Sequence, residues 1–456
     1  MCGLIAILDR HAGGWDRVSA ESAVERGLKF LEHRGLLGRS AIVERGGATL
    51  GHVRLPIIDL STNWDQPINV GDSTLAFVGE IFNFQELDPR ATCDTQVVGD
   101  RFFRFGPPGF HAFDGFWSVV FADRHRATVL TDYLSQKPLY FHRDSLMVAS
   151  EPLAISAALE RPLAPDPVFF ANVLKWGYDP TGRTPFAGVV QLPAGHALIY
   201  DQGLSLEPYW DWQRVPYDGD LAGVLIEATR RRLIGDREVA LLLSGGLDST
   251  IIFRILVEVL GENVKVFHAA NNEDEFLELA LAGHQSRPLR TPAVPIEDAV
   301  VAHQVPVDLG SMVPQLALAK ALRDEGFYVC MSGDGADELF GGYRRAKEYD
   351  SQASDVFTEL PYYHLPRLDR LMMAATVELR TPFLSPKVVR HAMQIPWAKR
   401  TSKQALKEVF GGLVPQEIIE REKHPLKTPD VINGGVEYRK QLIETWHRRI
   451  GLWSLR

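Results

Sequence analysis

Short hydrophobic runs alternate with polar turns along residues 1–205, which is the pattern of β-strands. Residues 4–8 predict a buried opening strand, and residues 17–33 predict a helix with Ser19 or Ser22 as its N-cap. Further strands are predicted at residues 50–56, 74–82, 116–121, 128–132, 139–142 and 146–149, with a hairpin turn at 123–126. Strands joined by such short turns favour antiparallel sheets in two layers.

The pattern changes after the polar and aromatic segment 208–220, which is the predicted linker. Helices are predicted at residues 221–233, 249–260 and 317–325, and strands at 238–243, 264–269 and 327–331. This alternation predicts a parallel α/β sheet, and the tail from residue 368 is predicted to be helical.

Length and composition suit a globular protein of two or three domains, with 456 residues, 45% hydrophobic and 23% charged. The net charge of -9 argues against a general nucleic-acid or membrane-surface binder. The three cysteines are too few for a disulfide scaffold, and the sequence shows neither a signal peptide nor a transmembrane run. A cytoplasmic protein is therefore expected.

A glycine-rich loop at residues 244–250 lies between a predicted strand and a predicted helix. Backbone N–H groups at such a helix start can hold an anion, and glycines let the backbone approach it. The residues expected to bind the phosphates of ATP are Ser244, Gly245, Gly246, Asp248, Ser249 and Thr250. This is not a Walker A loop, and it resembles the pyrophosphate loop of enzymes that cleave ATP to AMP and pyrophosphate. The alternative is a strand-to-helix turn with no ligand.

A second loop, residues 332–343, follows another predicted strand and carries Asp334, Asp337 and Glu338 among glycines. Carboxylates packed this closely need cations or donors, and Mg²⁺ prefers a few carboxylates together with phosphate oxygens and water. Loops that follow neighbouring parallel strands converge on one crevice. The alternative is a solvated acidic turn.

Cys2 directly follows the initiating methionine. Removal of Met1 would leave Cys2 with a free α-amino group, whose pKa lies near ~8. One residue could then supply both a thiol nucleophile and the base that takes its proton. The alternative is an ordinary cysteine that happens to be second.

Together these segments resemble the asparagine synthetase B family. The resemblance extends from Met1-Cys2-Gly3 to Arg421-Glu422-Lys423. Matching segments between them lie at residues 51–61, 79–83, 93–95, 137–140, 149–151, 192–196 and 377–384, in addition to the two loops.

The resemblance implies an α/β and α+β chain of two domains. Residues 1–207 would form a glutaminase with the N-terminal-nucleophile α-β-β-α sandwich, which releases ammonia into an internal channel. Cys2 would form the glutamyl thioester and Gly79 would donate to the oxyanion. Arg54 would bind the glutamine carboxylate, and Glu80 and Asp94 its amino group.

Residues 221–456 would form the synthetase, a parallel-sheet ATP pyrophosphatase domain that adenylates a carboxylate, with aspartate as the leading acceptor. The resemblance implies that Asp248 and Asp337 bind Mg²⁺ and that Asp334 is the base for ammonia. Gly333, Arg370 and Lys423 would contact the nucleotide, and Lys423 would neutralise the leaving pyrophosphate. Glu378 and Arg380 are expected to form a structural ion pair. Homodimers occur in the family, and no nucleic acid or membrane is an expected partner.

The chain departs from the family at several positions. Val78 replaces an asparagine that helps to hold the oxyanion, Leu36 and Leu37 replace Pro and Asp, and Ser135 replaces a glycine. Ser385 and the segment 273–305 also differ. Three hypotheses result: a glutamine-dependent asparagine synthetase or close amidotransferase, an amide synthetase for another carboxylate with a weak glutaminase, and a catalytically inactive nucleotide- or glutamine-binding regulator.

Overall fold

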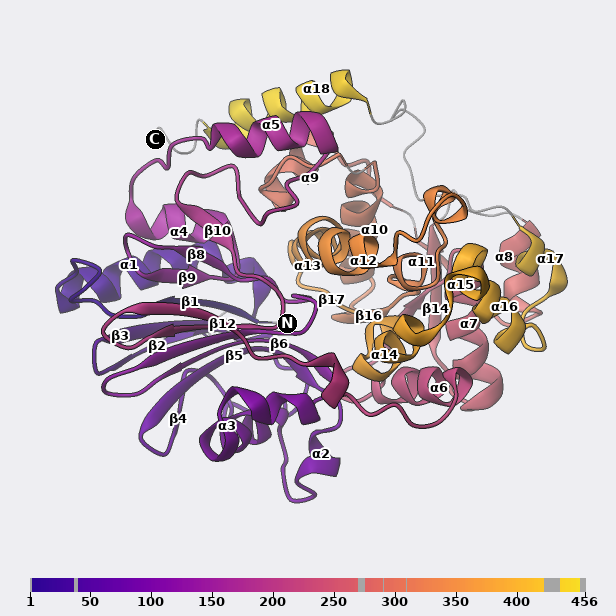
Figure 1. Ribbon diagram of the computed structural model, residues 1–456, viewed down its shortest axis with the longest axis horizontal. Helices are drawn as coiled ribbons and strands as arrows, with labels where there is room; N and C mark the ends of the chain where they lie inside the picture. The colour runs from indigo at the N-terminus through magenta and orange to yellow at the C-terminus, as the bar shows by residue number, and fades with distance from the viewer. Residues whose placement is uncertain are drawn as a thin grey trace.

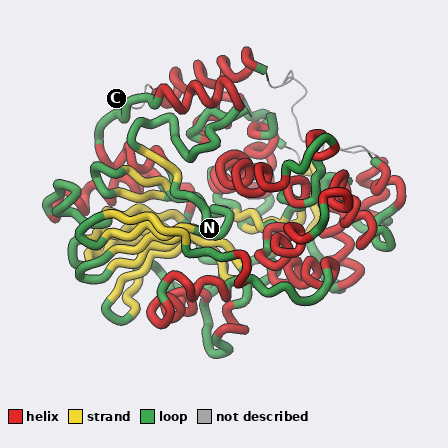
Figure 2. The backbone as a smooth tube through the Cα atoms, in the orientation of Figure 1, coloured by secondary structure: helices red, strands yellow, loops and turns green. Residues whose placement is uncertain are grey.

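The computed structural model describes residues 2–36, 40–269, 275–289, 291–308, 310–421 and 435–451. It contains a β-sandwich in the amino-terminal half and a helix-covered parallel sheet in the carboxyl-terminal half, which lie side by side (Figures 1 and 2). Among the helices described, none is long and apolar enough to cross a membrane.

Two six-stranded antiparallel sheets form the sandwich, in the orders β10-β8-β9-β1-β3-β2 and β12-β11-β7-β6-β5-β4. The first contains β1 (Gly3–Ile7), β2 (Ser40–Arg45), β3 (Ala48–Val53), β8 (Tyr140–His142), β9 (Met147–Ala149) and β10 (Val189–Gln191). The second contains β4 (Ile68–Val70), β5 (Ser73–Ile81), β6 (Gly115–Ala122), β7 (Ala127–Thr131), β11 (His196–Tyr200) and β12 (Leu204–Pro208). The predicted antiparallel, two-layer arrangement is confirmed.

Helices cover both outer faces of the sandwich. α1 (Arg17–Phe30) and α4 (Pro152–Leu159) pack on the first sheet, and α3 (Asp94–Phe105) packs on the second, beside the short α2 (Phe84–Leu87). α1 buries Ala20, Val24 and Leu28 on one face. The prediction that Ser19 or Ser22 caps α1 was wrong. Asp16 is the N-cap, because its carboxylate accepts a hydrogen bond from the Ser19 backbone N–H.

The second half is built on a parallel sheet in the order β15-β14-β13-β16-β17. Its strands are β13 (Val239–Leu242), β14 (Lys265–Ala269), β15 (Arg287–Leu289), β16 (Val329–Met331) and β17 (Glu378–Arg380). The prediction of a helical tail from residue 368 was wrong at β17. That strand has only three residues and two of them are charged, so it has no hydrophobic pattern of its own and depends on pairing with β16.

The second half also contains helices throughout its described residues. They are α6 (Leu221–Arg231), α7 (Leu247–Arg254), α8 (Glu275–Leu281), α9 (Ile296–His303), α10 (Met312–Asp324), α11 (Ala336–Leu339), α12 (Gln352–Ser354), α13 (Leu365–Met373), α14 (Pro386–Gln394), α15 (Trp397–Arg400), α16 (Gln404–Phe410), α17 (Gln416–Glu420) and α18 (Val436–Trp446). α18 lies against α5 (Pro167–Trp176) of the first half (Figure 1). Arg439 of α18 donates to the backbone oxygen of Leu174, and the Trp446 ring packs on Phe170.

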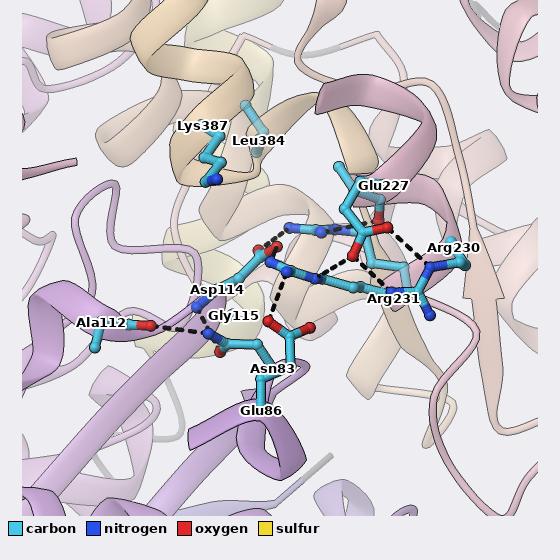
Figure 3. A network of polar contacts seen from close by, with 12 residues as sticks. Asn83, Glu86, Ala112, Asp114, Gly115, Glu227, Arg230, Arg231, Leu384 and Lys387 are labelled. Atoms are coloured by element: carbon cyan, nitrogen blue, oxygen red, sulfur yellow. Dashed lines mark hydrogen bonds and ion pairs between the residues drawn. The ribbon is translucent and has the colours of Figure 1, made fainter. Parts of the chain in front are cut away.

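Charged side chains join the two halves in a network of polar contacts (Figure 3). Asp114, just before β6, accepts from Arg231 at 3.1 Å and from Arg232 at 3.2 Å. Arg231 also pairs with Glu86 of α2 at 2.8 Å. Arg232 is fully buried, so its pairing with Asp114 is shielded from water and fixes the orientation of α6 against the sandwich.

Candidate active sites

Cys2 lies at the start of β1, enclosed between the sheets, with 8% of its surface exposed. Its Sγ atom is 3.9 Å from the carbonyl oxygen of Leu55, and its own carbonyl accepts from Arg34 Nε at 3.1 Å. Burial raises the pKa of the thiol to about 11, although the positive N-terminus acts in the opposite direction. An adjacent base is therefore needed to take the thiol proton near neutral pH.

Gly79 lies in β5 with a φ of +151°, a conformation that favours glycine. A Cβ atom at this position would approach the Phe116 carbonyl oxygen to 2.1 Å, so no other residue fits. The preceding Val78 is buried, with 1% of its surface exposed. A valine side chain offers no hydrogen-bond donor, so this strand supplies only backbone donors at the position of the family asparagine.

Glu80 and Asp94 form a buried acidic pair next to β5. Their surfaces are 5% and 3% exposed, and Asp94 accepts from the Ile81 backbone N–H at 3.0 Å. Burial, together with the charges of Glu378 and Asp94, holds the pKa of Glu80 well above its usual range. Burial also raises the pKa of Asp94 to about 6. Within the described part of the chain, Glu80 Oε2 has no hydrogen-bond partner, so the pair is suited to receive a cationic group.

Arg54 follows β3 and is 4% exposed. Its guanidinium donates to the carbonyl oxygens of Ile58 at 3.0 Å, Asp59 at 2.6 Å and Ser61 at 2.7 Å. It therefore holds the loop after residue 57 in place. The charge of Arg54 acts to lower the pKa of the Cys2 thiol, against the larger effect of burial.

The sheet of the second half carries the two predicted loops on adjacent strands. The loop at residues 244–250 leaves β13 and begins α7, with Ser244 Oγ 3.0 Å from Ser249 Oγ and Thr250 Oγ1 donating to the Gly246 carbonyl at 2.7 Å. Gly245 has a φ of +70°, and a Cβ atom there would come within 2.9 Å of the Leu277 backbone nitrogen. The glycines thus allow the close turn at the start of α7, the type of helix start that can hold an anion.

The loop at residues 332–343 leaves β16 beside the first loop. A Cβ atom on Gly333 would lie 2.8 Å from both the Asp248 carbonyl carbon and the Ser249 nitrogen, so glycine is what lets the loops touch. The two loops bring Asp248 and Asp337 together on one cation, the ammonium group of Lys403. Its Nζ atom is 2.5 Å from Asp248 Oδ2 and 2.6 Å from Asp337 Oδ1.

Lys403 is a residue that the sequence analysis missed. It belongs to neither loop and stands just before α16, and the two carboxylates hold the pKa of its ammonium group above its usual range, against the effect of burial. Two carboxylates at this spacing suit Mg²⁺ once phosphate oxygens and water complete the coordination shell. The described residues contain no group of three or more His, Cys, Asp or Glu side chains that could hold a metal by themselves.

Asp334 accepts from Ser332 Oγ at 2.6 Å and from Arg367 Nη2 at 3.3 Å. Arg367, also missed from the sequence, donates in addition to Ser311 Oγ at 2.6 Å. Asp334 is thus held by a hydroxyl and a guanidinium at the same sheet edge as Asp337.

Arg370 is placed differently from the other predicted nucleotide residues. It is 2% exposed, 3.3 Å from His303 Nε2, and it faces the Tyr140 ring of the sandwich. It therefore lies at the contact between the halves rather than on either loop. Lys423 lies outside the described residues.

The two sites are linked by Arg34. Besides the Cys2 carbonyl, it donates to both oxygens of Asp369 on α13, at 3.0 and 2.9 Å. Two residues earlier on the same helix, Arg367 contacts Asp334. The predicted ion pair of Arg380 with Glu378 is confirmed at 2.7 Å, with both side chains fully buried.

Comparisons with known proteins agree with this geometry. The family model described as "Glutamine amidotransferase domain" matches residues 1–210, and the one described as "Asparagine synthase" matches residues 220–357 and 349–449. A probable glutamine-hydrolysing asparagine synthetase of Acanthamoeba polyphaga mimivirus is 25% identical, covering 93% of this chain and 84% of that protein. Asparagine synthetase 3 of Bacillus subtilis is also 25% identical, covering 97% and 90%.

An amidase, chyE, of Penicillium rubens is 28% identical over 82% of this chain, but the chain spans only 64% of that protein. The two family models together account for both halves of the structure, the sandwich with its N-terminal cysteine and the parallel sheet with its two loops. The chain belongs to the asparagine synthetase B family of glutamine-dependent amidotransferases, which join an N-terminal-nucleophile glutaminase to an ATP-using synthetase.

Proposed function

We propose that the chain converts the carboxylate of aspartate into an amide, with ATP as the activating substrate and glutamine as the nitrogen donor. The observation that carries this proposal is the convergence of Asp248 and Asp337 at one sheet edge, in a chain that encloses Cys2 in its other half. Residues 1–207 act as the glutaminase and residues 221–456 as the synthetase.

In the glutaminase, Cys2 Sγ attacks the side-chain amide of glutamine, ammonia leaves, and water then hydrolyses the glutamyl thioester to release glutamate and restore the thiol. The Gly79 N–H stabilises the oxyanion. Glu80 and Asp94 bind the ammonium group of glutamine, which supplies the cation that this buried pair needs. Arg54 attracts the carboxylate of the same substrate.

In the synthetase, the backbone and hydroxyl groups of residues 244–250 hold the phosphates of ATP, together with Gly333. Asp248 and Asp337 would hold Mg²⁺, which would supply positive charge beside the pyrophosphate. Asp334 accepts a proton from ammonia as it attacks the acyl-adenylate. Lys423 adds positive charge on the pyrophosphate side in this proposal, whereas Arg370 lies at the contact between the halves and is left without a phosphate role.

The test supplies the purified protein with MgATP and aspartate, together with either glutamine or ammonium, and measures pyrophosphate and asparagine by mass spectrometry. Asparagine formed with glutamine supports the proposal. Asparagine formed only with ammonium would show that the glutaminase is inactive. If neither donor gives pyrophosphate, aspartate is excluded as the substrate and other carboxylates are tested. A cytoplasmic location and a homodimeric state remain predictions. Light scattering tests whether the protein is a homodimer.

A further inference from the structure

A small cavity lies at the contact between the two halves. Its lining includes Tyr140, Thr184 and Gln191 of the first half and Val305, Val307 and Arg370 of the second. The described residues that line it include neither Cys2 nor a member of the two sheet-edge loops. A volume of about 20 Å³ leaves room for one small molecule of a few atoms. A molecule bound there would contact both halves at once.

The guanidinium of Arg370 brings a buried positive charge to this cavity. The residue is 2% exposed, its Nε donates to the Pro366 carbonyl at 3.3 Å, and its Nη2 is 3.3 Å from His303 Nε2. Nη1 has no hydrogen-bond partner, and no carboxylate of the described chain forms an ion pair with Arg370. A buried charge without a counter-ion is costly, so an anion beside this nitrogen is favoured.

His303 does not supply the missing negative charge. Its Nδ1 is 2.6 Å from the Val305 carbonyl oxygen, so Nδ1 carries the proton and Nε2 accepts from Arg370. Burial, together with the neighbouring charge of Arg370, holds the pKa of the imidazole well below its usual range. The neutral ring therefore satisfies one N–H group of the arginine and leaves its charge uncompensated.

The other charged side chains that line the cavity have partners of their own. Asp179 Oδ1 accepts from the backbone N–H of Thr181 at 2.8 Å and from its hydroxyl at 2.7 Å, and Oδ2 accepts from Asn172 at 2.7 Å. Arg183 pairs with Asp166 at 2.8 Å. Among the described residues of the lining, Arg370 is thus the cation that lacks an ion pair.

We propose that this cavity binds one small carboxylate ion of the size of formate, held by Nη1 of Arg370. One free guanidinium nitrogen suits a single anionic oxygen, because the other two nitrogens already donate and leave no fork for a phosphate. Since both halves line the cavity, the ion stabilises their contact when it binds. This inference is independent of the proposed reaction.

The experiment follows thermal unfolding of the full chain in sodium formate and in sodium gluconate at equal ionic strength. Both anions carry one carboxylate, but gluconate is too large for the cavity. We expect saturating formate to raise the unfolding midpoint by about 1–2 °C relative to gluconate. Line broadening of isotope-labelled formate in the NMR spectrum measures the binding directly. Arg370→Met should lose both effects. Arg231→Met is the matched control and should keep both, because that guanidinium is paired with Asp114 and Glu86.

A second variant keeps the test independent of how Arg370→Met folds. Val307→Leu fills part of the cavity and leaves the arginine in place, so it should also lose the formate effect. Equal midpoints of the unmodified protein in formate and gluconate, with no line broadening, would overturn the inference and leave water as the occupant. Formate binding that persists in Arg370→Met or in Val307→Leu would overturn it as well.

Discussion

Each half of the molecule contains a pair of acidic side chains, and the two pairs differ in whether a cation of the protein contacts them. Glu80 and Asp94 are buried in the sandwich, and among the described residues neither forms an ion pair, so the pKa of each is raised. Asp248 and Asp337 share the ammonium group of Lys403 at contact distance. In the proposed function the first pair receives a cation that arrives on a substrate. The second pair already contacts a cation of the protein, and in the proposed function it binds a metal ion beside a polyanion.

The most severe test of this division is Cys2→Ala. Without the thiolate, glutamine-dependent amide formation should fall by about 10⁴-fold or more, since the nucleophile forms the covalent intermediate. Pyrophosphate formation with ammonium as donor should be unchanged, because the synthetase site lies in the other half. A coupled pyrophosphate assay measures the reaction with glutamine and the reaction with ammonium. Cys93→Ser is the control, and loss of the ammonium reaction in Cys2→Ala would contradict the separation.

Arg380→Met tests the positive charge that the second half places beside the first acidic pair. Arg380 and Glu378 are fully buried, and the charge of Arg380 also acts on Glu80. Removing the arginine leaves Glu378 unpaired, so we expect the free energy of unfolding to fall by ~3–5 kcal/mol. Thermal and urea unfolding measure this loss. The double variant Glu378→Leu with Arg380→Met should recover most of the lost free energy of unfolding. If the double variant is destabilised as much as Arg380→Met alone, packing rather than the unpaired charge is responsible.

Val78→Asn returns an amide donor to the strand that carries Gly79. In other hydrolytic sites one oxyanion donor contributes at least ~100-fold to kcat. We therefore expect glutaminase kcat to rise by as much as ~100-fold. The measurement is glutamate release with glutamine as the only substrate. Val78→Thr is the control, since its hydroxyl is shorter than an amide. An unchanged kcat would mean that the backbone N–H of Gly79 is sufficient.

The pH dependence distinguishes the two halves by a smaller effect. Below pH about 6 Asp94 takes up a proton and loses the charge that attracts the glutamine ammonium group, so kcat/KM for glutamine should fall by up to ~10-fold per unit. Because the folded pKa lies above the ordinary 3.8, ionisation of Asp94 also lowers stability as pH rises between these values. In Asp94→Asn, kcat/KM for glutamine should no longer fall below pH about 6. The same fall in the reaction with ammonium would show that another group is responsible.

Ser402→Gly gives the smallest expected change. Glycine adopts the left-handed conformation of residue 402 without the steric cost, so stability should increase by about 1 kcal/mol in thermal unfolding. The placement of Lys403 between Asp248 and Asp337 should persist. A decrease in stability would show that the serine side chain contributes more than its conformation costs.

Local patterns were sufficient for much of the structure. Hydrophobic runs located β1, β5, β6 and β13, and glycines with neighbouring carboxylates located both loops, because these signals lie within a few residues of one another. Lys403 had no such signal, since it stands 155 residues from Asp248 in the chain. β17 likewise depends on its neighbour β16, and Arg367 acquires its role only where α13 meets the sheet edge.

The position of α18 has a consequence for how the protein is made. The helix covers α5 of the sandwich, with Trp446 packed on Phe170 and Phe186. The strands of the sandwich are all present in the nascent chain by residue 208, but the segment that covers α5 leaves the ribosome about half a chain later. Until then the sandwich carries an apolar face without its natural cover, the kind of surface that chaperones bind. The second half of the chain thus completes the surface of the first.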